Sequence, residues 1–167
     1  MIIRVASTRF GELEIEADKV INMPDGMLGF NEQRYILLSS GSGPFCWLQA
    51  VDNPDLAFIV VDAKTTVPEF EVKLTADEYR LLGFTGQAET VVLAVVTMAS
   101  NPLDITINLL GPIVINPYAM TAIQVVLEGS RYSTRHPYFD DSLTKKYQNT
   151  ELQDENANIG LEKLYAG

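Results

Sequence analysis

The sequence predicts a mainly β fold, namely a compact, antiparallel, barrel-like single domain with one short helix and a polar C-terminal tail. The chain has 167 residues, of which 47% are hydrophobic and 20% charged. These values fit one domain with a real core and exclude global disorder. Short apolar or alternating segments recur between turn residues, and helical signals occur once. A βαβ fold would need repeated crossover helices, so an antiparallel barrel or sandwich is favoured.

The first half of the chain supplies five expected strands, separated by turn residues. Leu13 to Glu16 alternates with period two, as a half-buried strand does. Pro24-Asp25-Gly26 has turn chemistry, because proline sets one φ and glycine permits a positive φ. Turns are also expected at 39–44 and 52–55. The strands so delimited are 13–16, 20–21, 35–38, 45–51 and 56–61.

The second half supplies five more strands and one helix. Alternation or β-branched runs predict strands at 70–74, 91–98, 105–109, 113–115 and 123–127. Thr75 and Glu78 stand at capping-box spacing, and Gly83 is a suitable C-terminal stop, so a helix of about two turns is expected between them.

The chain becomes polar after Phe139. We therefore expect a β-barrel domain over residues 1–139 and a mobile tail over 140–167, outside the core. The alternative prediction for this tail is a helix docked on the barrel. Its apolar stripe would consist of Leu152, Ile159, Leu161 and Leu164.

Charge restricts the possible partners. With 22 Asp plus Glu and 12 Lys plus Arg, the net charge is -10. This argues against direct nucleic-acid binding and against docking on an anionic membrane, whereas a basic protein remains compatible. Residues 81–130 contain no Lys or Arg but do contain Glu89, Asp104 and Glu128. This stretch is either a solvated acidic face or a site for a basic protein.

Composition also limits localisation and chemistry. The single cysteine, Cys46, cannot form an internal disulfide, and neither a signal peptide nor a long apolar span is evident, so a cytoplasmic protein is expected. One His and one Cys exclude a zinc site built on several such ligands. We expect no cofactor and no metal.

Three groups of residues are candidate sites. Arg135 and His136 could include a general base, although no nearby group would orient it. Asp52 and Asp55 could bind a cation but fit a turn better, because an EF-hand needs more ligands. Phe45 and Trp47 lie two apart in one strand and so share a face, which either packs in the core or meets a partner.

Several blocks, in this order, resemble the FliW family of flagellar assembly factors. They are Phe10-Gly11-Glu12-Leu13-Glu14-Ile15, Met23-Pro24-Asp25-Gly26-Met27-Leu28-Gly29-Phe30, residues 44–58, Asn108-Leu109-Leu110-Gly111-Pro112-Ile113-Val114-Ile115-Asn116, Gln124-Val125-Val126-Leu127 and Tyr132-Ser133-Thr134-Arg135-His136-Pro137. Together they span about residues 2–138. Asp62-Ala63 departs from the family pattern, in which a proline often follows the aspartate.

The resemblance implies a non-enzymatic cytoplasmic protein that binds flagellin and antagonises the translational repressor CsrA. Flagellin synthesis would thereby be matched to filament assembly. The alternative is a small β-barrel ligand-binding protein or a carboxylate-dependent enzyme. The partner-binding candidates are Phe45, Trp47, Asp52, Asp55, Glu89, Asp104, Glu128, Tyr132, Arg135 and His136.

Overall fold

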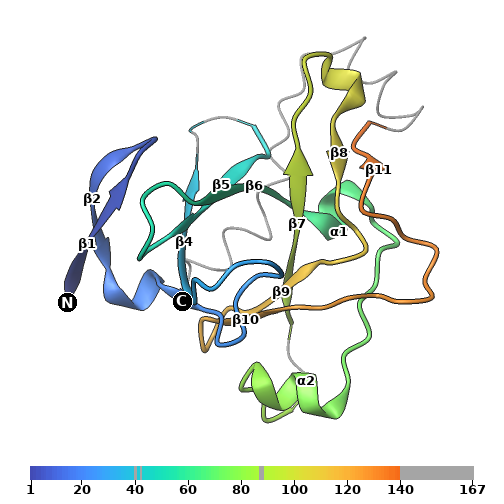
Figure 1. Cartoon of the computed structure of the whole chain (residues 1–167). Coiled ribbons are helices and arrows are strands. Elements are labelled where there is room, and N and C mark those ends of the chain that lie inside the picture. The colour runs from blue at the N-terminus through green and yellow to red at the C-terminus, as the bar shows by residue number, and fades with distance from the viewer. Residues whose placement is uncertain (40, 42, 87–88, 140–167) are drawn as a thin grey trace.

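A closed ring of β-strands forms the centre of the protein (Figure 1). The computed structural model describes residues 1–139 except 40, 42, 87 and 88. The ring runs β7-β6-β5-β4-β3-β10-β9, and pairing of β7 with β9 closes it. Its members are β3 (Ile21–Asn22), β4 (Arg34–Ser39), β5 (Cys46–Ala50), β6 (Ala57–Asp62), β7 (Val91–Thr97), β9 (Ile113–Asn116) and β10 (Thr121–Gln124).

The expected barrel is confirmed, with one difference in strand direction. All pairings in the ring are antiparallel except that of β3 with β10, where Thr121 lies opposite Asn22 in parallel register. The barrel is therefore mixed. This pair joins strands about a hundred residues apart in the chain, so local alternation could not reveal its direction.

The remaining elements surround the ring. β1 (Ile2–Ser7) and β2 (Gly11–Glu16) form a separate hairpin, and β8 (Thr106–Ile107) and β11 (His136–Pro137) extend the sheet beyond β7. The helices are short: η1 (Ala17–Lys19), α1 (Ala63–Thr66), α2 (Ala76–Leu81) and η2 (Pro102–Asp104). The sequence reading missed β1, β11 and every helix except α2.

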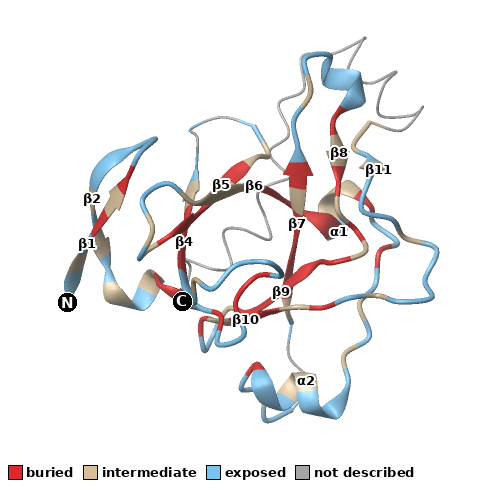
Figure 2. Cartoon of the chain, in the orientation of Figure 1, coloured by how far each residue is buried: buried red, intermediate tan, exposed pale blue. Residues whose placement is uncertain are grey.

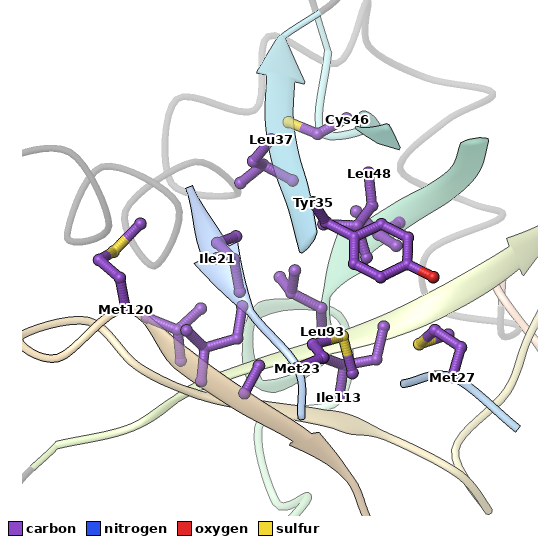
Figure 3. Packing of buried hydrophobic residues seen from close by; sticks show 14 of the residues in the cluster. Ile21, Met23, Met27, Tyr35, Leu37, Cys46, Leu48, Leu93, Ile113 and Met120 are labelled. Carbon is purple, nitrogen blue, oxygen red and sulfur yellow. The ribbon is translucent and has the colours of Figure 1, made fainter. Parts of the chain in front are cut away.

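β7 separates two hydrophobic cores. Alternation along this strand places Val91 and Leu93 in the inner core, which the ring encloses, whereas Val92 and Ala94 belong to an outer core. Figure 2 shows most of the strand buried, and Figure 3 shows the inner core from close by. The apolar run at 91–96 is thus a strand with both faces covered.

The expected strand at 70–74 is wrong. The segment belongs to no described strand, although its alternation does correspond to burial. Phe70 is fully buried in the outer core, and Val72 and Leu74 pack against it. An alternating pattern requires one covered face, and here that face is covered without a strand partner.

The expected helix is confirmed as α2, with both its end signals. Thr75 accepts from the Glu78 N–H at 3.1 Å, and Glu78 accepts from the Thr75 N–H at 2.8 Å. Gly83 has φ +82° and donates to Arg80 O, while Phe84 N–H donates to Tyr79 O. These two bonds form a Schellman motif, and the Tyr79 and Phe84 rings meet edge-on beside it.

The β1–β2 hairpin is attached to the barrel by a third apolar cluster and by a buried polar residue. Ile3, Leu13 and Ile15 pack with Ile36 of β4. Gln49, fully buried, accepts from Ser7 Oγ at 2.8 Å. Its amide Nε2, which has two N–H donors, lies 3.1–3.3 Å from the carbonyl oxygens of residues 50, 53, 54 and 56 and is shared among them. One side chain therefore organises the β5–β6 turn and ties the hairpin to it.

The tail over 140–167, both as a mobile segment and as a docked helix, lies outside the described residues.

Tyr35→Phe should leave stability unchanged or raise it. Within the described residues, the hydroxyl of this fully buried side chain has no hydrogen-bond partner. Desolvation raises its pKa to about 12. Removing a buried unpartnered polar group relieves a cost of about 1–3 kcal/mol. Urea unfolding would test this, with exposed Tyr118→Phe as the control. A loss above about 1 kcal/mol would mean that the hydroxyl has a partner.

Gln49→Leu should lower the free energy of unfolding by roughly 1–3 kcal/mol, because the buried Ser7 hydroxyl loses its acceptor and the partly buried turn carbonyls lose the amide that donates to them. Gln33→Leu is the matched control, since its exposed amide reaches one carbonyl, that of Pro24. Equal midpoints for the two variants in urea would refute the organising role of Gln49.

Candidate functional site

The predicted aromatic anchors lie outside the ring and are partly covered. Phe45 packs against the outer core with its ring centroid 5.1 Å from that of Tyr138. Trp47 meets the edge of Phe10 at 6.1 Å, and the Arg9 guanidinium lies 4.3 Å from its ring centroid. Cys46, between them, points into the inner core. The shared face of Phe45 and Trp47 is therefore used in packing, and both side chains are half-buried.

Tyr132 is also half-buried, with its ring 4.7 Å from that of Phe70 in an edge-on contact. Its neighbour His136 lies in β11, opposite Ile107 of β8, and Arg135 is exposed. These three residues share one segment along the outer core, but they do not form a site with the aspartates.

The two candidate aspartates are both exposed and engaged. Arg34 donates two hydrogen bonds to Asp52, at 3.0 and 2.6 Å, and these lower the pKa of that carboxyl. Asp55 accepts from the Thr8 hydroxyl. The expected turn at 52–55 is confirmed by the bond from Leu56 N–H to Asn53 O.

The acidic residues of the stretch without Lys or Arg do not gather. Glu89 precedes β7, whereas Asp104 lies in η2, beyond the other end of that strand. Glu128 follows β10. All three are exposed. They are therefore distributed over the surface and do not form one acidic site.

The geometry of the described residues favours neither a metal site nor a reactive thiol. Among the described residues, no group of three or more His, Cys, Asp or Glu side chains is placed to hold a metal ion. Burial raises the pKa of the Cys46 thiol to about 11, so this thiol stays protonated near neutral pH.

An acidic ridge lies on the β1–β2 hairpin and was missed by the sequence reading. Glu12, Glu14 and Glu16 alternate along β2 and are all exposed, while the intervening Leu13 and Ile15 face the barrel. Arg4 lies opposite Glu14, and the two line a hollow of about 650 Å³ with Glu12 and Leu13. The alternation at 13–16 contained this signal.

A second missed surface lies at one end of the barrel, on the loop between β3 and β4. Leu28 and Phe30 are exposed, whereas Met27 is buried in the inner core. Phe30 rests edge-on against Phe58 of β6 at 5.1 Å. We call residues 24–33 and 51–56 together the barrel-end surface. The turn signal at Pro24-Asp25-Gly26 located the loop but could not indicate which side chains it exposes.

None of the helices in the described part of the chain has the length and apolarity that crossing a membrane requires.

Comparison with known proteins gives one consistent family. The profile of the family described as "FliW protein" matches residues 4–138. A relative from Geotalea uraniireducens, named "Flagellar assembly factor FliW", is 56% identical over 155 residues, which cover 91% of this chain and 95% of the relative. A relative of the same name from Geobacter sulfurreducens is 55% identical, covering 85% of this chain and 90% of the relative.

Structural comparison agrees with the sequence comparison. The crystal structure of a flagellar assembly factor FliW superposes with a TM-score of 0.77 at 30% identity, covering 83% of this chain and 99% of that one. The chain belongs to the FliW family of flagellar assembly factors.

Proposed function

We propose that this chain is a non-catalytic cytoplasmic regulator that binds flagellin and antagonises the repressor CsrA. In the free state it restrains the repressor, and flagellin synthesis proceeds. When flagellin accumulates, it occupies the chain, and the repressor is released to block translation. The proposal needs no cofactor, no metal and no contact with nucleic acid by this chain.

The observation that carries the proposal is membership of the FliW family, which extends over nearly the whole described chain. The charge supports it, because a protein with a net charge of -10 attracts a basic RNA-binding protein. Family membership also favours a protein-binding role over the alternative of a ligand-binding protein or carboxylate-dependent enzyme. The hydrogen bonds of Asp52 and Asp55 also favour a protein-binding role over a carboxylate-dependent enzyme, because both carboxylates already have partners within the chain.

A direct test is to mix the purified chain with monomeric flagellin or with CsrA and to follow each complex by size-exclusion chromatography with light scattering. We expect a complex with each partner. An absence of both complexes at micromolar concentrations would contradict the proposal.

Association with the repressor should depend strongly on salt. Raising ionic strength from about 0.05 to 0.5 M shortens the Debye length from roughly 14 to 4 Å. Because exposed charges act mainly on association rates, the on-rate should fall markedly over this range. A surface-binding measurement of on-rates would test this, and a rate independent of salt would refute it.

The acidic ridge should matter more to that on-rate than the dispersed acidic residues. Along β2 the three glutamates follow at intervals of about 7 Å, within one Debye length at physiological salt, so their fields add. They outnumber the two cations beside them, the Met1 ammonium 3.8 Å from Glu16 and Arg4 opposite Glu14. We expect E12Q/E14Q/E16Q to slow association more than E89Q/D104N/E128Q, which removes the same charge from separated sites. If the two triple variants slow association equally, the on-rate depends only on the net charge of the chain, and the acidic ridge has no special role.

A further inference from the structure

The barrel-end surface presents large apolar side chains to solvent. The exposed fractions are 64% for Leu28 and 42% for Phe30. Both follow Met27, which is only 4% exposed, so the loop buries one apolar residue and displays the next ones. Exposed apolar groups that occur together often mark a site of protein contact.

The loop holds these side chains in a defined arrangement. Leu28 N–H donates to Gln124 Oε1 of β10 at 2.9 Å, and Phe30 N–H donates to Met27 O at 2.9 Å. Gly26 has φ +66°, and a Cβ there would lie 3.0 Å from Phe30 O, so the tight turn requires glycine. A preorganised surface loses little conformational entropy when a partner binds.

Carboxylates border the apolar residues. Glu32 accepts from Asn53 Nδ2 at 3.0 Å, which joins the two loops of the surface and lowers the pKa of that carboxyl. Asp25, Asp52 and Asp55 are exposed on the same loops. Arg34 is the only Lys or Arg between residues 20 and 58, and it is paired with Asp52. The border is therefore negative.

A surface with exposed apolar side chains and a negative border is complementary to an amphipathic helix whose apolar stripe is flanked by Lys or Arg. The stripe would cover Leu28 and Phe30, and the basic side chains would face the carboxylates. We propose that the barrel-end surface docks such a helix of flagellin, an inference that rests on the proposed function. It places the flagellin contact away from Phe45, Trp47 and Tyr132, which are half-buried, whereas Leu28 and Phe30 are exposed.

The test compares variants in a titration with full-length monomeric flagellin. L28S/F30S should weaken binding at least tenfold. M98S/L103S is the matched control, because Met98 and Leu103 are 49% and 41% exposed. They lie at the end of β7 and in η2, well separated from the loop after β3 (Figure 1). This control should bind flagellin like the unmodified chain.

Folding is checked by thermal unfolding of each variant. Because Phe30 contacts Phe58, Leu28→Ser alone serves as the milder second variant, and it should weaken binding in the same direction. Raising the salt from about 0.05 to 0.5 M should also weaken binding, since the negative border would be screened.

The outcomes separate the two proposals. If the unmodified chain binds flagellin and the folded variants L28S/F30S and Leu28→Ser bind it equally well, the docking surface is refuted and the proposed function stands. If these variants lose CsrA but keep flagellin, the surface belongs to the repressor and the inference is overturned. If the unmodified chain does not bind flagellin, both this inference and the flagellin part of the proposed function fail.

Discussion

Closure of the strand ring through β7 is the constraint on which the rest of the structure depends. β7 pairs with β6 and with β9, and its two faces supply both the inner and the outer core. With both faces buried, the strand has no position for a charge, as the run Val91–Val96 reflects. Closure removes the free edges that an open sheet of these strands would expose. The exposed glutamates of the attached hairpin and the exposed apolar side chains of the loop after β3 lie outside this closed ring.

Local patterns predicted local structure accurately. The capping box at Thr75 and Glu78 and the stop at Gly83 located α2, because these signals act within one helical turn. The segment 70–74 shows the limit of such patterns. The alternation correctly predicted that Phe70 is buried, but it could not indicate whether a neighbouring strand is available for pairing. The parallel β3–β10 pair and the β7–β9 closure depend on distant segments, so one sequence without homologues could not indicate them.

The candidate site was less predictable than the fold for the same reason. The common face of Phe45 and Trp47 followed from strand periodicity, whereas its covering by Tyr138, Phe10 and Arg9 is a tertiary effect. Conversely, Leu28 and Phe30 stand in a turn-rich loop where no periodicity distinguishes exposed from buried residues. Counting charges identified an acidic protein but not its acidic ridge, which was visible in the alternation of glutamates along 12–16 but was not recognised as one face of a strand.

We propose that flagellin and CsrA act on this chain in opposition, and the acidic exterior, the preorganised apolar barrel end and membership of a family of flagellar assembly factors support this proposal. Reconstituted translation of flagellin mRNA would measure this opposition. With CsrA present, adding the chain should restore flagellin synthesis, and adding monomeric flagellin should then repress it again. If the chain fails to relieve repression, or if flagellin fails to reverse the relief, the claim is contradicted.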